Sequence, residues 1–266
     1  MKCVICLSLK GVEIIASGSA DGSIIIWNVE SGERLFVLKA PGRGILDLAV
    51  DPETLNYDGE NEEGDIIVFS ASSLGEIRRW AIKKDLSMAK EIESDKPITQ
   101  HETSVYKLSF DIDGDLWTAS ADTTIHCLSR HHSFTPSLTL QHSDYVRSVA
   151  IDEVGGYVIS AGRDEDVKVW NKGSGELRGV YEGHWEEVMG VVVVGRRVVS
   201  GGIDGTVRVW GLDKQSLERA TKEAEDVRNG VEEVEVVEEE GEGKENPFGI
   251  DEDEMRELEE LMEEGE

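Results

Sequence analysis

Short stretches in which apolar and polar residues alternate fill the first four fifths of the chain, and pairs of turn-forming residues separate them. The stretch at 200–210, SGGIDGTVRVW, shows the pattern: small residues, an Asp-Gly pair, then alternating valines that end at a tryptophan. A period of two predicts strands with one buried face, and Asp-Gly between two such strands predicts a hairpin. The pattern therefore predicts an all-β region built from short antiparallel strands.

This unit occurs five times along the chain. The copies are SGSADGSIIIW at 17–27, SASSLGEIRRW at 70–80, TASADTTIHCL at 118–128, SAGRDEDVKVW at 160–170 and SGGIDGTVRVW at 200–210. Their last residues, Trp27, Trp80, Leu128, Trp170 and Trp210, lie 53, 48, 42 and 40 positions apart. Four short antiparallel strands in ~40–45 residues is the period of a propeller blade, so the spacing predicts a repeat architecture.

We expect one blade for each copy. The predicted boundaries are 1–39, 40–93, 98–140, 141–182 and 183–212. An acidic insertion at 51–64 accounts for the longest spacing. It is long for a hairpin loop, which predicts a mobile loop that extends from one rim. After Trp210 the residue types suit either an outer strand at 217–221 or a helix at 215–227.

The repeated units resemble WD40 repeats. The resemblance rests on the Gly183-His184 opening, the Asp-Gly turn and the terminal Trp, which is followed here by Asn, Gly or Ala in place of the usual Asp. It covers residues 1 to about 212 and implies a WD40 β-propeller. Since WD40 domains most often have seven blades, we prefer an incomplete or open ring of five blades with N-terminal blades missing. A closed five-bladed ring is the alternative, and an open arc would leave unpaired edge strands.

The resemblance also implies a buried hydrogen-bond chain of His, Ser or Thr, Asp and Trp within each blade. The residues it assigns are His142, Ser160, Asp164 and Trp170; His184, Ser200, Asp204 and Trp210; His101, Thr118 and Asp122, with Leu128 in place of Trp; Ser17, Asp21 and Trp27; and, in the second copy, only Ser70 and Trp80. Ser, His and Asp together also suggest a hydrolase triad. A nucleophile, however, has to be exposed beside its base, and here the set recurs from blade to blade, so we interpret it as structural.

Charge narrows the classes of partner. The chain has 56 acidic and 27 basic residues, and 23 of the acidic but only 6 of the basic ones follow position 212. Such an acidic protein is repelled by phosphate backbones and anionic lipid, so we expect no direct nucleic-acid or membrane binding. No segment approaches the ~20 apolar residues of a membrane span. Three cysteines give no disulfide framework, and Cys3 and Cys6 are expected to be small buried residues. We therefore expect a cytoplasmic or nuclear protein that is not secreted.

The acidic C-terminal part is predicted to consist of two segments. Residues 213–246 are charge-dense and poor in aromatic residues, which predicts a linker that is partly helical or disordered. Residues 247–266 contain apolar positions at helical spacing and predict a short acidic amphipathic helix. The composition of the acidic C-terminal part indicates a solvent-exposed tail. The more specific hypothesis is that residues 247–266 are a motif that binds an apolar groove with a basic rim on a partner protein.

The function we expect is that of a non-catalytic scaffold or adaptor that presents rim loops to partner proteins and needs no cofactor or metal. Trp185, Tyr145, Arg163 and Arg43 are the candidate contact residues, because they fall in predicted loops and because Trp, Tyr and Arg are favoured in binding hot spots. For Trp185 and Tyr145, packing between adjacent blades is the competing interpretation. The alternatives are a substrate receptor of a ubiquitin ligase and an enzyme that uses the central channel of the propeller.

Overall fold

The computed structural model describes residues 1–41, 44–55, 65–93 and 95–228, which lie in one compact unit. Its strands are β1 (Cys3–Leu9), β2 (Val12–Gly18), β3 (Ser23–Asn28), β4 (Arg34–Lys39), β5 (Ile45–Val50), β6 (Asp65–Ser72), β7 (Ile77–Lys83), β8 (Ala89–Ile92), β9 (Val105–Phe110), β10 (Leu116–Ser120), β11 (Thr124–Ser129), β12 (Thr135–Gln141), β13 (Val146–Asp152), β14 (Tyr157–Gly162), β15 (Val167–Asn171), β16 (Leu177–Tyr181), β17 (Val188–Val194), β18 (Arg197–Gly202) and β19 (Val207–Gly211). The helices are α1 (Pro52–Leu55), the 3-10 turn η1 (Arg130–His132) and α2 (Lys214–Arg228).

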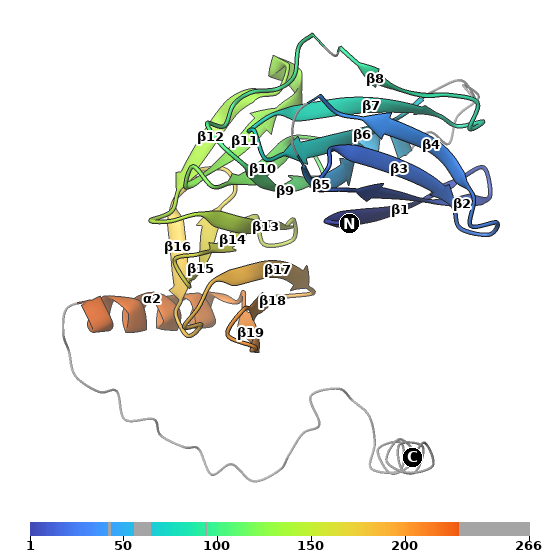
Figure 1. Cartoon of the computed structure of the whole chain (residues 1–266). Helices are drawn as coiled ribbons and strands as arrows, with labels where there is room; N and C mark the ends of the chain where they lie inside the picture. Colours follow the sequence, from blue (N-terminus) through green and yellow to red (C-terminus); the bar gives the residue numbers. More distant parts are fainter. Residues whose placement is uncertain (42–43, 56–64, 94, 229–266) are drawn as a thin grey trace, which may run out of the picture. The chain divides into compact units, whose positions relative to one another are not determined.

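The strands form five antiparallel sheets, each a meander in chain order (Figure 1). Sheet A contains β1–β4, sheet B β5–β8, sheet C β9–β12, sheet D β13–β16 and sheet E β17–β19. The predicted all-β propeller class is confirmed, with one sheet for each repeat.

The tight turns explain why the repeated unit folds into hairpins. Gly22 and Gly205 follow an Asp and have φ of 81° and 75°, the left-handed region that glycine enters without a steric penalty. In sheet A the Asp21 carboxylate also accepts a hydrogen bond from the Ser23 backbone N–H at 2.9 Å. The third and fourth copies have Thr123 and Glu165 instead of glycine, at φ of 71° and 68°. The Asp therefore preserves the turn even where the glycine is lost.

Consecutive sheets pack against each other through apolar cores, and at two of these interfaces a hydrogen bond joins the inner strands. Asp47 of sheet B accepts the Leu108 backbone N–H of sheet C at 2.9 Å, and Ser148 of sheet D accepts the Val191 N–H of sheet E at 3.2 Å. Both acceptors are buried, so each contact pairs a backbone group that water cannot reach. These contacts help to fix sheet B against sheet C and sheet D against sheet E.

The acidic insertion departs from the prediction at its start. Residues 52–55 form α1, and the carboxylate of Asp51, just before the helix, accepts hydrogen bonds from both Nη atoms of Arg130, at 3.0 and 2.6 Å. The same guanidinium lies 5.7 Å from the Phe110 ring centre and 5.6 Å from that of Phe134. The first part of the insertion is therefore anchored to sheet C. Residues 56–64 lie outside the described residues.

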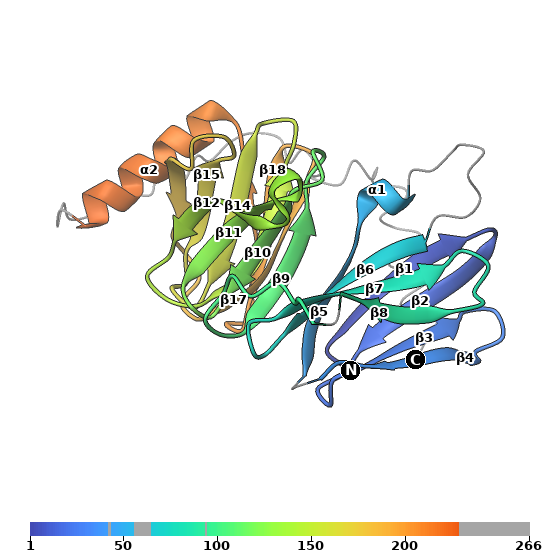
Figure 2. The same cartoon turned by 90° about the horizontal axis from the view of Figure 1, so that it is seen from above.

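After Trp210 the chain forms the helix, so the alternative of a strand at 217–221 is wrong. Asp213 caps α2: its carboxylate accepts the Ser216 N–H at 3.0 Å. The helix then packs against β16 of sheet D, with Leu217 and Ala220 buried and the Thr221 hydroxyl donating to the Arg178 carbonyl at 3.0 Å. Figure 2 shows α2 beside the strands of this sheet. Among the described residues, sheet E has three strands, whereas the other four sheets have four.

Two smaller findings complete the description. Cys3 is half-buried but Cys6 is exposed, so the expectation that both are buried is wrong. They lie on opposite faces of β1, since side chains alternate along a strand. Of the helices described, none has the length and apolar character needed to cross a membrane.

Candidate functional site

Sheets D and E each contain a four-residue hydrogen-bond chain, which we call the clasp. In sheet D, His142 Nδ1 lies 2.8 Å from Asp164 Oδ2, His142 Nε2 lies 2.7 Å from Ser160 Oγ, and Trp170 Nε1 donates to the same Oγ at 2.8 Å. The Ser Oγ can satisfy both neighbours by accepting from the indole and donating to the imidazole. This assigns the proton of the imidazole to Nδ1, facing the carboxylate.

The clasp of sheet E repeats this geometry closely. His184, Ser200, Asp204 and Trp210 are joined by three contacts of 2.8 Å each. The loop between β16 and β17 and the turn between β18 and β19 are thereby tied to the middle of the sheet.

The other three sheets hold partial versions. In sheet C, His101 reaches Asp122 at 2.8 Å and Thr118 at 2.7 Å, but Leu128 takes the position of the Trp. The His126 ring stacks on His101 instead, with ring centres 4.5 Å apart. In the part of sheets A and B that the structure describes, the indole contact remains, with Trp27 donating to Ser17 at 3.0 Å and Trp80 to Ser70 at 2.8 Å.

Ionisation in the clasp follows from burial and from charge. Burial alone would raise the pKa of Asp164, but hydrogen bonds from His142 and the Lys168 ammonium outweigh it and lower the pKa to about 2. For the same balance of causes the pKa values of Asp122 and Asp204 are also low, with a Thr taking the place of the Lys. Burial lowers the pKa of His142 in spite of its carboxylate partner. The sheet D clasp therefore holds a neutral imidazole against an ionised carboxylate.

The clasps are structural elements rather than catalytic sites. Ser160, Ser200 and Thr118 are almost completely buried, and their histidines are buried as well. Each hydroxyl is saturated by its neighbours, so it could not be presented to a substrate beside a base and an oxyanion site. A satisfied buried polar network instead holds the sheet in one register.

The sheet D clasp contains one unfavourable contact. Asp166 stands where sheets C and E have Thr124 and Thr206, whose hydroxyls donate to the clasp Asp at 2.6 and 2.9 Å. Burial, followed by the charges of Asp164 and Glu182, raises the pKa of Asp166 to about 6, against the opposing effect of Lys168. Asp164 Oδ1 is buried and has no hydrogen-bond partner among the described residues.

Asp166→Thr is therefore expected to raise the free energy of unfolding by about 1 kcal/mol at pH 7, through one added buried hydrogen bond and the loss of like-charge repulsion. The raised pKa of Asp166 costs stability only at pH values at which this side chain is ionised in the unfolded chain. The gain in the free energy of unfolding should therefore be complete above pH 6 and shrink towards pH 4. Urea unfolding at the two pH values measures it. A variant that is no more stable than the parent at pH 7 contradicts this interpretation.

The candidate contact residues lie in the loops that the clasps position. Trp185, directly after His184, has 63% of its surface exposed, and its backbone N–H approaches Asp204 Oδ2 at 3.4 Å. Tyr145 is 37% exposed and lies in the corresponding loop of sheet D, with the Arg163 guanidinium 5.5 Å from its ring centre. An indole exposed to this extent does not pack between blades. Arg43 lies outside the described residues.

One residue of this region escaped the sequence analysis. The Arg208 guanidinium lies 5.2 Å from the ring centre of Trp185 and stacks on it. The available signal was positional: a basic residue stands two places before the Trp in the second, fourth and fifth copies, at Arg78, Lys168 and Arg208.

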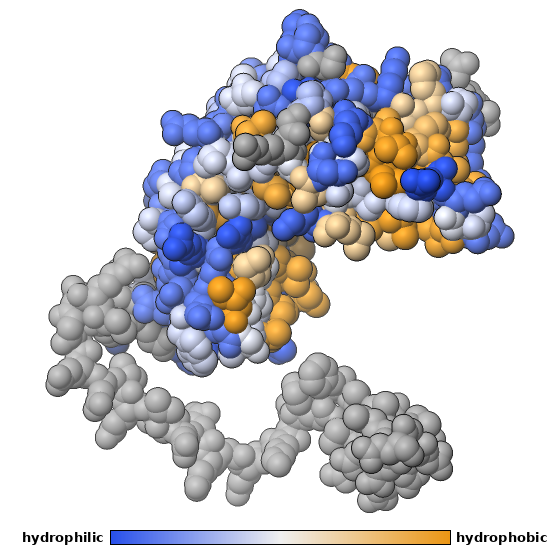
Figure 3. Space-filling view, in the orientation of Figure 1, coloured by the Kyte–Doolittle hydropathy of each residue, from blue (hydrophilic) through white to orange (hydrophobic). Residues whose placement is uncertain are grey.

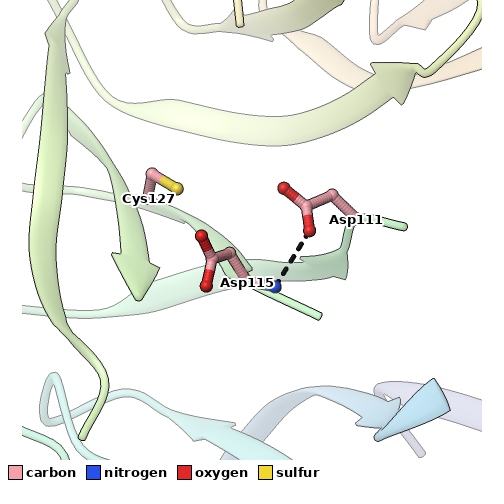
Figure 4. Close-up of side chains that lie close together, drawn as sticks. All are labelled: Asp111, Asp115 and Cys127. Atoms are coloured by element: carbon pink, nitrogen blue, oxygen red, sulfur yellow. Dashed lines mark hydrogen bonds between the residues drawn. The ribbon is translucent and has the colours of Figure 1, made fainter. Parts of the chain in front are cut away.

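A cluster of potential metal ligands occurs in sheet C (Figure 4). Ligand atoms of Asp111, Asp115 and Cys127 lie within 4.8 Å of one another. Asp111 already accepts the Trp117 indole N–H at 3.0 Å and lies 3.1 Å from Lys172 Nζ, while burial raises the pKa of the Cys127 thiol to about 11. A lysine and a neutral thiol make this set a poor cation site, and ion pairing explains the grouping.

Comparison with known proteins identifies the repeats. The family model "WD domain, G-beta repeat" matches residues 3–28, 93–128, 134–171 and 175–211. Among solved structures, the WD40 β-propeller domain of Doa1 superposes with a TM-score of 0.60 at 22% identity, over 76% of this chain and 62% of that one. At this identity the likeness bears on the fold alone.

The curated relatives are longer than this chain. An uncharacterized WD repeat-containing protein of Schizosaccharomyces pombe is 31% identical over 217 residues, which are 80% of this chain and 54% of that protein. Telomerase protein component 1 of Mus musculus is 27% identical over 77% of this chain and 8% of its own length, and the nuclear distribution protein nudF of Aspergillus niger is 27% identical over 64% and 35%. The chain thus spans about half of the first relative and less of the others.

Proposed function

Because this chain belongs to the WD40-repeat family, whose members serve in general as protein-interaction modules, we propose that it is a non-catalytic scaffold that binds partner proteins through the rim carrying Trp185 and Tyr145. The observation that carries the proposal is the exposed indole of Trp185. It stands on a loop fixed by the His184 clasp, and most of its surface stays exposed although the Arg208 guanidinium lies over the ring. A large aromatic side chain on a rigid loop loses little entropy on binding, which is why such residues dominate interfaces.

Two further features support a role in a multiprotein assembly. The relatives include a protein component of telomerase and a nuclear distribution protein, which are named for assemblies and processes rather than for a reaction. The strong acidic charge favours partners with basic surfaces, because opposite potentials steer association. We propose a cytoplasmic or nuclear location, with residues 247–266 as a second contact; that segment lies outside the described residues.

Trp185→Ala is expected to weaken the binding of partner proteins. It should change the free energy of unfolding by less than about 0.5 kcal/mol, because an exposed side chain contributes little to folding. For a hot-spot indole the loss of affinity should be at least about 30-fold. Affinity purification with mass spectrometry identifies the set of partners, and titration of one purified partner measures the loss. Val154→Ala, which alters another exposed apolar residue, is the matched control. Retention of every partner by Trp185→Ala would refute the role of this rim.

A further inference from the structure

A groove lies between the helix α2 and the end of sheet D at which β16 begins. Its volume is about 550 Å³, within the range of pockets that bind ligands. Three apolar and three basic residues give its lining most of its character: Tyr157, Leu177, Leu217, Arg178, Lys214 and Lys222. We call this surface the α2 groove.

The helix side of the α2 groove is fixed against the sheet. Leu217 is buried against β16, where Gly179 allows the close approach: a Cβ at this position would lie 3.1 Å from Leu217 Cδ2. Just before the helix, the Arg196 guanidinium donates to the Leu212 carbonyl at 2.7 Å and to the Asp152 carboxylate at 2.8 Å. The groove is thus formed without a ligand, so binding requires little further ordering of the chain.

Leu177 gives the α2 groove an exposed apolar contact. This leucine of β16 has 45% of its surface exposed. In the view of Figure 3, the region of sheet D is mainly hydrophilic, whereas apolar surface gathers around β17–β19. An exposed leucine is therefore unusual in this sheet, and together with Tyr157 it offers an apolar side chain of a ligand a surface to pack on.

The charge of the α2 groove is opposite to that of the chain as a whole. Three cations and one carboxylate, that of Glu218, line it, whereas the chain has 56 acidic and 27 basic residues. At physiological salt, exposed charges more than about 8 Å away are largely screened. The residues of the groove itself therefore decide which ligand is attracted there, and they favour an anionic one.

The cations of the α2 groove are available to a ligand. Arg178 pairs with Glu176 at 2.8 Å and Lys214 pairs with Glu218 at 3.5 Å, but these four side chains are between 48% and 89% exposed. Ion pairs in contact with water contribute little to stability. A carboxylate of a ligand can therefore replace the resident carboxylate at small cost.

We propose that the α2 groove binds an acidic segment of a partner protein, in which Glu or Asp residues flank an apolar residue such as Leu. The apolar residue packs on Leu177 and Tyr157, and the flanking carboxylates pair with Arg178 of the sheet and Lys222 of the helix. The groove lies at the start of β16, whereas Trp185 follows its end. It is therefore a second contact surface, beyond the proposed rim.

The test uses the full chain and three fluorescent peptides: one with Leu flanked by Glu, one with Gln in place of Glu, and one with Ser in place of Leu. Anisotropy titration should show that the Glu-Leu peptide binds at least about tenfold more tightly than the other two, since each of them lacks one kind of contact. Lys222→Glu should weaken its binding at least about fivefold, because an attraction becomes a repulsion. Lys90→Glu, the same change at an exposed lysine of sheet B, is the matched control.

Hydrogen exchange places the binding site: saturating Glu-Leu peptide should slow exchange in α2 and β16. Trp185→Ala should leave the affinity for this peptide unchanged, so that a failure of the rim proposal and a failure of the groove proposal remain distinguishable. The proposal is overturned if the Gln or Ser peptide binds equally well, or if Lys222→Glu and Lys90→Glu weaken binding equally. It is also overturned if the Glu-Leu peptide does not bind the full chain. Binding that appears only after deletion of residues 229–266 would identify the acidic end of this chain, and not a partner, as the occupant.

Discussion

His142→Ala is expected to lower the free energy of unfolding by about 3 kcal/mol. The substitution removes the donor to Asp164 and the acceptor of the Ser160 hydroxyl, and each buried polar group left without a partner costs about 1–3 kcal/mol. It also leaves a cavity beside the Trp170 ring, whose centre lies 5.9 Å from that of the imidazole. Urea unfolding measures the loss, and hydrogen exchange should show it most strongly in the amides of sheet D.

The matched control is His131→Ala, at an exposed histidine of η1, which should change stability by less than about 0.5 kcal/mol. Because the clasp acts as one network, Ser160→Ala combined with His142→Ala should cost less than the sum of the two single changes. Additive losses would show that the contacts are independent and would contradict the description of the clasp as a unit.

The repeat architecture could be predicted because every signal for it is local and recurs. Alternation, the Asp at the turn and the terminal Trp all lie within eleven residues, so five copies reinforce one another. The histidines lie farther away, 16 to 18 residues before the Ser or Thr that they contact, as His184 and Ser200 show. Their pairing came from the family resemblance and not from the spacing itself.

Features decided by packing could not be predicted. Strand β8, with the sequence AKEI, has no apolar alternation and is held in part by the ion pair of Arg78 with Glu91. The contact of Asp51 with Arg130 joins residues 79 positions apart, and neither has a local signal. The choice of helix over strand after Trp210 depends on the surface of β16, against which Leu217 is buried. Whether a side chain of β1 is buried, as for half-buried Cys3 and exposed Cys6, likewise depends on which elements pack against each face of the strand.

Acidification from pH 4 to pH 2 is expected to lower the free energy of unfolding by about 2 kcal/mol through Asp164 alone. Its pKa is about 2 in the folded chain and 3.8 for the free side chain, so the unfolded state binds the proton first. The stability it contributes is complete above pH 4 and is lost as the pH falls through 2. Asp122 and Asp204, with pKa values lowered in the same direction, should add to the loss.

Between pH 6.5 and 4, two groups change the free energy of unfolding in opposite directions, so the experiment has to separate them. The lowered pKa of His142 makes the unfolded state bind a proton first as the pH falls below 6.5, which destabilises the fold. The raised pKa of Asp166 makes the folded state bind first below about 6, which stabilises it. Urea unfolding in the Asp166→Thr background removes the second effect, so stability should then fall continuously from pH 6.5 to 2. Adding Asp164→Asn should make the free energy of unfolding depend less steeply on pH below pH 4. An equally steep loss of stability in this range would show that the acid sensitivity arises outside the sheet D clasp.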